Sequence, residues 1–183
     1  SFTSGKKVMI LEKKLTAYLG CKYCALVSNG TIALDLALKA LKIKPNDEII
    51  VPAMSYFSTA SSVSYQNAKP VFVDIENKTF NIDPNRIEEA ITRKTKAIIF
   101  IDYGGNPSDI DKINGIGSKY DIPILQDAAQ SLGGMYKGKN IGANGKLSTV
   151  SFHMAKIITT IEGGAIFTNE KNIYNDILTR RNI

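Results

Sequence analysis

The sequence has few of the residues, and none of the long apolar segments, that several classes of protein need. Its 183 residues include two cysteines and a single histidine, and two cysteines are too few for a disulfide scaffold. No run of eighteen apolar residues occurs, so we expect no transmembrane helix. Residues 1–7 lead into no apolar core, so we expect no signal peptide and predict a cytoplasmic protein.

Three common motifs of nucleotide-binding proteins and hydrolases are also absent. The sequence holds no Gly-x-x-x-x-Gly-Lys-Ser/Thr loop, no Gly-x-Gly-x-x-Gly after a strand and no Gly-x-Ser-x-Gly. It therefore lacks the signatures of a P-loop nucleoside triphosphatase, a dinucleotide-binding domain and an α/β-hydrolase.

The two cysteines are spaced as Cys21-x-x-Cys24. A structural zinc site needs four ligands, and His153 is the only other soft candidate. A redox pair normally lies where a strand turns into a helix, whereas Cys24 opens an apolar segment that resembles a buried strand. We therefore expect neither a metal site nor a redox pair.

The net charge is modestly positive, with 23 Lys and Arg against 17 Asp and Glu, or +6. The lysines are scattered and form no run of five or six like charges. Aromatic residues do not alternate with them as in proteins that bind single strands. We therefore expect no nucleic-acid partner; a solvated basic surface is the plainer explanation, and an anionic substrate is compatible with it.

Segments typical of strands and helices alternate along the chain, which predicts a three-layer α/β/α sandwich around a mostly parallel sheet. The strand segments are apolar and non-alternating, as expected for strands covered on both faces. Composition is that of an ordinary globular protein, with 44% apolar residues, and one domain over 1–183 is expected. The chain ends within a helical pattern that has no stop signal, which suggests truncation. The predicted strands are 25–27, 48–52, 70–75, 97–101, 123–125, 148–152 and 165–167, and the predicted helices include 11–18, 32–41 and 84–91.

Four chemically distinct groups follow the predicted strands, where ligands bind in open α/β sheets. Residues 28–31, Ser-Asn-Gly-Thr, begin a helix and can hold an anion. Tyr56, Asp127 and Lys156 each follow a different strand. Singly these have plainer explanations, namely a helix cap, a core ring and a solvated charge. Together they match pyridoxal phosphate, which needs an anion site, a stacking surface, a carboxylate for its pyridinium nitrogen and a lysine for its aldehyde.

The order of the motifs resembles that of the DegT/DnrJ/StrS sugar aminotransferases, which are fold-type I pyridoxal-phosphate enzymes. The matching segments are 28–34, 127–130, 151–156 and 162–165, and the resemblance extends over essentially the whole chain. It implies that residues 1–183 form the large, cofactor-binding domain of such an enzyme, with the C-terminal small domain absent.

The resemblance implies three residues that act on the reacting part of the cofactor. Lys156 would bind the cofactor covalently and then serve as the catalytic acid and base. Asp127 would pair with the pyridinium nitrogen. Gln130 would reach the ring oxygen or nearby backbone.

It also implies the residues that hold the rest of the cofactor. Thr31, the backbone amide of Ile32 and the hydroxyl of Ser151 would bind the phosphate, and Tyr56 would stack on the ring. His153 is expected to be a positioning neighbour rather than a catalytic group.

The implied reaction moves an amino group from an amino acid, expected to be glutamate, to a nucleotide-linked keto-deoxy sugar, for polysaccharide or glycoconjugate biosynthesis. Relatives act as homodimers, and a homodimer is expected here. The retained Lys156 argues against the dehydratase branch of the family, where a histidine replaces the lysine. Two alternatives stay open: another fold-type I enzyme, such as a desulfurase or lyase, and a non-catalytic binding or regulatory module.

Overall fold

The computed structural model describes residues 5–181, so both ends of the predicted domain 1–183 lie outside the described residues. The strands of the main sheet are β1 (Tyr23–Val27), β2 (Glu48–Pro52), β3 (Lys69–Val73), β4 (Thr95–Ile101), β5 (Ile124–Asp127), β8 (Leu147–Ser151) and β9 (Gly164–Thr168). The helices are α1 (Lys6–Leu19), α2 (Gly30–Ala40), α3 (Ser58–Tyr65), α4 (Pro84–Ala90), α5 (Ile110–Tyr120) and α6 (Lys171–Arg181). Strands β6 (Met135–Tyr136) and β7 (Lys139–Asn140) form a separate small hairpin.

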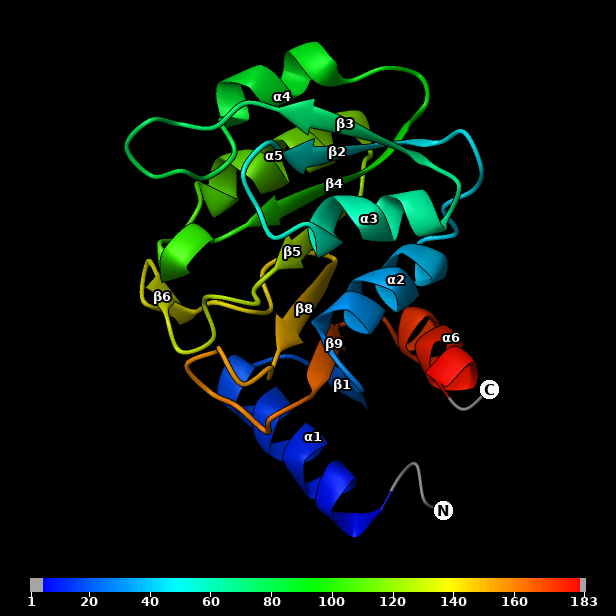
Figure 1. The fold of residues 1–183 in the computed structure, drawn as a ribbon, viewed down its shortest axis with the longest axis vertical. Coiled ribbons are helices and arrows are strands. Elements are labelled where there is room, and N and C mark those ends of the chain that lie inside the picture. Colours follow the sequence, from blue (N-terminus) through cyan, green and yellow to red (C-terminus); the bar gives the residue numbers. More distant parts are fainter. Residues whose placement is uncertain (1–4, 182–183) are drawn as a thin grey trace.

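The main sheet has the order β1-β9-β8-β5-β4-β2-β3 (Figure 1). Neighbours from β8 to β3 pair in parallel, whereas β9 is antiparallel to both β1 and β8. Since β1 and β8 are both antiparallel to β9, they run in the same direction as each other. The carboxyl ends of six strands therefore meet at one edge of the sheet.

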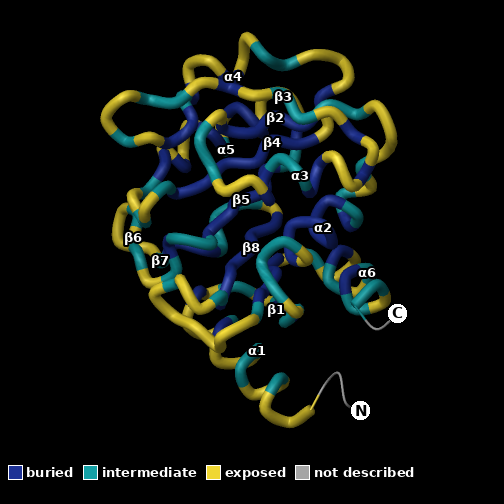
Figure 2. Tube along the Cα trace, viewed as in Figure 1, coloured by how far each residue is buried: buried dark blue, intermediate teal, exposed yellow. Residues whose placement is uncertain are grey.

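Helices cover both faces of this sheet, which confirms the predicted three-layer α/β/α sandwich. On one face α2, α3 and α6 pack their apolar side chains against the strands. On the other face α4 and α5 cover the β4 half, and α1 covers β1, β8 and β9. The central strands are buried along most of their length (Figure 2).

The two cysteines lie in this core region, and neither is expected to be reactive. Burial raises the pKa of both the Cys21 and the Cys24 thiols, so both are protonated at neutral pH. Within residues 5–181 no group of three or more His, Cys, Asp or Glu side chains is arranged to hold a metal ion. None of the helices described is long and apolar enough to cross a membrane.

A close backbone contact joins the start of α2 to the start of β9. A Cβ atom added at Gly164 would overlap the backbone carbonyl of Asn29 and would lie 2.9 Å from the nitrogen of Gly30. Backbone on both sides of this contact cannot rotate away as a side chain can. A glycine at position 164 is therefore needed for the turn between β1 and α2 to lie against β9.

The substitution Gly164→Ala should destabilise the protein, because the added methyl group must displace backbone at Asn29. We expect a loss of about 2–3 kcal/mol in the free energy of unfolding, measured by urea denaturation. The matched control is Gly115→Ala on the exposed face of α5, where nothing lies within 4 Å of the added Cβ. It should stabilise the protein by about 0.5–1 kcal/mol. Equal effects of the two substitutions would contradict this account.

Candidate active site

A cavity of about 490 Å³ opens at the carboxyl edge of the sheet. It lies between the N-terminus of α2, the ends of β5 and β8, and the loop that follows β8. Of the seven residues predicted for the site, the structure brings six to this cavity: Thr31, Tyr56, Asp127, Gln130, Ser151 and Lys156. Ile32 is not among the lining residues, and its backbone amide donates a hydrogen bond to Oδ1 of Asn29.

The N-terminus of α2 forms the polar wall of the cavity. The Asn29 side chain caps the helix, while the amides of Gly30 and Thr31 belong to the first turn, whose N–H groups have no partner within the helix. The hydroxyls of Thr31 and Ser58 lie 2.7 Å apart. A Cβ on Gly30 would lie 2.9 Å from the Cβ of Ser151. Glycine there lets the helix terminus approach the end of β8, which suits the binding of an anion.

Asp127 places a carboxylate at the floor of the cavity. It is 3% exposed, and it accepts hydrogen bonds from the amide of Ala129 at 3.1 Å and from the hydroxyl of Thr59 at 3.0 Å. Burial is the main influence on its pKa and raises it, while these two donors and the positive charge of Lys156 act in the opposite direction. The carboxylate is thus poised to gain from a cationic partner in the cavity.

Lys156 is positioned by a tight turn just after β8. Its backbone amide donates to the carbonyl of His153 at 2.9 Å, and Nδ1 of His153 accepts from the amide of Ala155 at 3.2 Å. The histidine therefore shapes the turn that presents the lysine, in keeping with the positioning role expected from the sequence. Residues 153, 155 and 156 all line the cavity.

Gln130 and Tyr56 lie at the rim. Oε1 of Gln130 accepts a hydrogen bond of 2.7 Å from the amide of Gly104, so the side chain does reach nearby backbone. Tyr56 is 60% exposed as a residue, and its ring packs against that of Phe57, with centroids 4.6 Å apart. Tyr56 therefore lies at the entrance of the cavity, where its ring can cover one face of a bound ring.

Three hydroxyl residues of this site were not predicted from the sequence: Ser58, Thr59 and Thr149. Thr59 contacts Asp127 directly, and Ser58 pairs with Thr31. Thr149 lies beside Asp127 in the sheet register and lines the cavity. Among the described residues its hydroxyl oxygen has no hydrogen-bond partner although it is buried, whereas buried polar groups normally have one.

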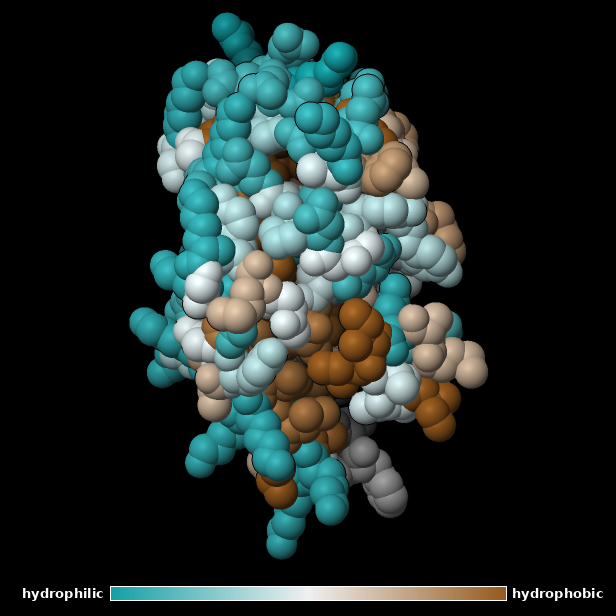
Figure 3. Space-filling model, turned by 90° about the vertical axis from the view of Figure 1, so that its left-hand side faces the viewer, coloured by the Kyte–Doolittle hydropathy of each residue, from teal (hydrophilic) through white to brown (hydrophobic). Residues whose placement is uncertain are grey.

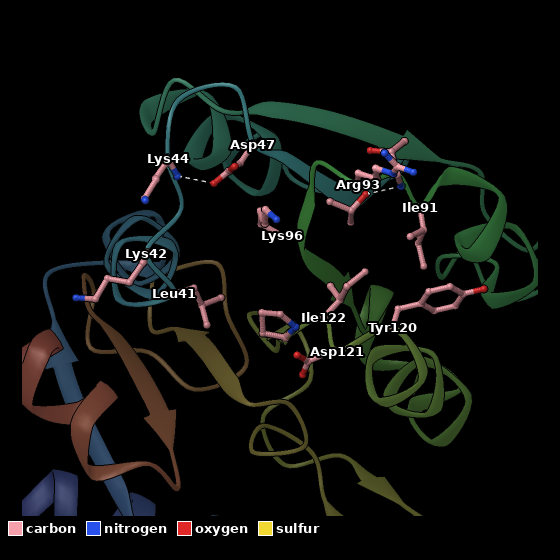
Figure 4. Close-up of a pocket in the computed structure, with 13 residues that line it drawn as sticks. Leu41, Lys42, Lys44, Asp47, Ile91, Arg93, Lys96, Tyr120, Asp121 and Ile122 are labelled. Atoms are coloured by element: carbon pink, nitrogen blue, oxygen red, sulfur yellow. Dashed lines mark hydrogen bonds between the residues drawn. The ribbon is translucent and has the colours of Figure 1, made fainter.

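A second opening of about 940 Å³ lies at the opposite edge of the sheet. Its lining comes from the segments that follow α2, α4 and α5 (Figure 4). Basic residues there include Lys42, Lys44, Arg93 and Lys96, and Figure 4 shows them spread around the opening rather than converging. Cations near helix C-termini complement the helix dipole, so this opening needs no ligand to explain its charge.

The fold and the first cavity define a ligand-binding α/β/α domain in which a helix terminus, a buried carboxylate and a lysine meet. Residues 1–183 match the DegT/DnrJ/EryC1/StrS aminotransferase family. The chain belongs to this family, which confirms the resemblance carried by the sequence motifs.

Individual relatives show the range within this family. The chain is 45% identical to the UDP-2-acetamido-2-deoxy-3-oxo-D-glucuronate aminotransferase of Pseudomonas aeruginosa, over 92% of this chain and 47% of that protein. NtdA of Bacillus subtilis, solved with bound PMP, is 34% identical with a TM-score of 0.91, over 96% of this chain and 40% of that one. A GDP-4-keto-6-deoxymannose-3-dehydratase, solved with bound GDP-perosamine, is 37% identical with a TM-score of 0.90, over 95% and 47%. The chain spans about half the length of the curated relatives it matches.

The substitution Asp127→Asn should stabilise the ligand-free protein at alkaline pH. Because burial raises the pKa of Asp127 in the folded state, the folded protein binds this proton more tightly than the unfolded chain does. Stability is therefore highest below the unfolded pKa and is lost as the pH rises through the folded pKa. We expect the melting temperature of the variant to exceed that of the unsubstituted protein at pH 8 by about 2–4 °C, equivalent to about 1 kcal/mol, with the difference shrinking toward pH 4.

A carboxylate in the opposite situation provides the control. Asp111 on α5 is exposed and its pKa is lowered by hydrogen bonding to Lys137, so Asp111→Asn should not raise the melting temperature at pH 8. A gain of the same size in both variants would show that the effect does not come from the burial of Asp127.

Proposed function

We propose that this chain is the cofactor-binding large domain of a pyridoxal-phosphate-dependent sugar-nucleotide aminotransferase, acting in the cytoplasm. The single observation that carries the proposal is the meeting of Lys156, Asp127 and the α2 N-terminus around one cavity. Family membership and the aminotransferase relatives support it. NtdA, solved with PMP, supports the choice of cofactor.

The residues around the cavity fit pyridoxal phosphate. The first turn of α2 and the hydroxyls of Thr31 and Ser151 would hold the phosphate, and the carboxylate of Asp127 would accept a hydrogen bond from the protonated pyridinium nitrogen. Thr149, which lies beside Asp127 in the sheet, also lines the cavity. When bound, pyridoxal phosphate supplies an aldehyde for the amino group and a ring that withdraws electrons from the reacting carbon.

Lys156 is the residue that would move protons. Its Nζ is the one side-chain amine among the described residues that line the cavity. In our proposal it holds the cofactor between reactions. During a reaction, its released amine takes a proton from the carbon that carries the amino group and delivers that proton to the cofactor. The hydrogen bonds from Thr59 and Ala129 favour the ionised form of Asp127 in this cycle.

Lys156 also favours amino transfer over dehydration, the reaction named for the dehydratase relative that is 37% identical to this chain. The family resemblance places a histidine instead of this lysine in dehydratases. A desulfurase or lyase of the same fold type would share Lys156 and Asp127, and a binding module that has lost the reaction would keep the fold alone. Transfer of nitrogen from glutamate to a nucleotide-linked ketosugar, measured against turnover of amino acids alone, separates these alternatives.

We propose a homodimer as the working form. Figure 3 shows apolar side chains gathered on the lower part of one face of the molecule. The loop that follows β8 carries four exposed apolar side chains, Met154, Ile157, Ile158 and Ile161. Ile157 is 85% exposed and directly follows Lys156, so a second copy covering this loop would also close the cavity. Exposed apolar patches of this kind mark interaction surfaces.

The first prediction of this proposal concerns Lys156. With added pyridoxal phosphate, the protein should develop a visible absorption band, and borohydride should then add the cofactor mass to Lys156. Lys156→Ala should lose both signals, and in a chain of the relatives' length it should lower the rate of amino transfer by at least about a thousandfold. The control Lys96→Ala, in the opening at the opposite edge, should keep both signals. Covalent labelling of the Lys156→Ala variant, or no band even in the longer chain, would contradict the proposal.

The second prediction concerns the dimer. Sedimentation should show the unsubstituted protein as a dimer, and Ile157→Glu should shift it to monomer because a charge would be buried in the interface. Phe72→Glu is the matched control, since Phe72 is also exposed but lies on β3 at the far edge of the sheet. A monomer before substitution, or equal dissociation of both variants, would overturn the interface.

A further inference from the structure

A second buried carboxylate, Asp102, lies behind the candidate site. It directly follows β4 and is 0% exposed. Its Oδ1 accepts the amide of Ser108 at 3.0 Å, and its Oδ2 accepts Nε2 of Gln126 at 2.8 Å and the hydroxyl of Ser131 at 3.0 Å. All three donors belong to segments at the carboxyl edge of the sheet.

Gln126 and Ser131 are the two ends of the turn that carries the site residues. Between them lie Asp127, Ala129, whose amide binds Asp127, and Gln130. Gln126 and Asp127 are consecutive on β5, so their side chains point to opposite faces of the sheet. One oxygen of Asp102 therefore holds both ends of this turn from the face opposite the cavity.

The donors and acceptors around Gln126 leave its amide one orientation. Nε2 donates to Asp102, while Oε1 accepts from the amide of Asn144 at 3.0 Å and from the hydroxyl of Ser148 at 3.2 Å. Turning the amide over would set oxygen against oxygen on one side and N–H against N–H on the other. Since Gln126 is fully buried, no water compensates for such a mismatch.

We propose that Asp102 is a positioning residue, which through Gln126 and Ser131 fixes the turn that presents Asp127 and Gln130 to the bound cofactor. This inference rests on the proposed function, because its consequence is read as cofactor affinity. Asp102 is not among the residues that line the cavity, so in this proposal it acts only through the turn.

The proposal can be tested by exchanging the carboxylate acceptor of Asp102 and the amide donor of Gln126 between the two positions. In Asp102→Asn, a single amide oxygen replaces two carboxylate oxygens that accept from opposite sides. The new N–H group therefore faces an N–H of either Gln126 or Ser108. In Gln126→Glu, two carboxylate oxygens face each other. In the double variant Asp102→Asn/Gln126→Glu, the asparagine amide donates to the glutamate, and the second glutamate oxygen still accepts from Asn144 and Ser148. The double variant keeps one buried carboxylate and restores the lost hydrogen bond.

A similar pair away from the site serves as the control. Oδ1 of Asp35 on α2 accepts Nε2 of Gln66 at 2.6 Å, and both residues are largely buried. Neither lines the cavity. The other oxygen of Asp35 accepts from Lys39. Asp35→Asn therefore removes a largely buried carboxylate and its ion pair without touching the turn at 126–131.

The first measurement is the dissociation constant of pyridoxal phosphate, from titration of the visible band. Asp102→Asn and Gln126→Glu should each weaken binding by about tenfold or more, and the double variant should return to within about threefold of the unsubstituted protein. Asp35→Asn should lower the melting temperature but leave affinity within about twofold. Unchanged affinity in Asp102→Asn, or no recovery in the double variant, would overturn the proposal.

The second measurement is amide hydrogen exchange without cofactor. Exchange at Ala129 and Ser131 should quicken in Asp102→Asn, recover in the double variant and stay unchanged in Asp35→Asn. If no pyridoxal phosphate bound even in a chain of the relatives' length, the proposed function would fail, and exchange would still decide whether Asp102 fixes the turn. Unaltered exchange at these amides in Asp102→Asn would overturn the positioning role on its own.

Discussion

The burial of the Asp127 carboxylate is the constraint on which the candidate site depends. A carboxylate taken out of water loses its hydration, and the protein must replace it. Two donors do so in part, the amide of Ala129 and the hydroxyl of Thr59, and Lys156 adds a positive charge. These groups come from the turn after β5, from α3 and from the loop after β8. The ionised form is therefore supported only when three segments far apart in the sequence are folded together.

The direction of the strands brings those segments to one place. Six of the seven strands run the same way, so the loops that follow β1, β5 and β8 open at the same edge. Direction alone does not bring the loops into contact, however. Close packing at two glycines does: Gly30 meets Ser151, and Gly164 meets the backbone of Asn29. The helix terminus that can bind an anion is thereby held beside the strand end that precedes Lys156.

The strands of the sheet and the loops after them could largely be predicted from the sequence. Buried parallel strands are continuous apolar segments, and each is followed directly by the loop at its carboxyl end. Predicted strands such as 97–101 differ from the observed bounds by one or two residues. Helix α3 could not be predicted, since it is rich in serine and threonine and is fixed by packing against α2. The contacts made by Thr59 and by the pair Asp102 and Gln126 depend on which strands become neighbours, and no local pattern encodes that. The amide of Ile32, expected to bind phosphate, is already paired with its own helix cap.

Similarity of fold does not by itself choose among the reactions of this family. The chain is 45% identical to an aminotransferase and 37% identical to a dehydratase, and in each comparison it spans about half of the relative. A shared fold hosts different chemistries, and function is decided by groups at the site. A lysine amine at the end of the turn after β8 can both hold an aldehyde and exchange protons with carbon. In the proposed function, amino transfer therefore depends on one side chain, while the rest of the domain fixes where that side chain meets Asp127 and the N-terminus of α2.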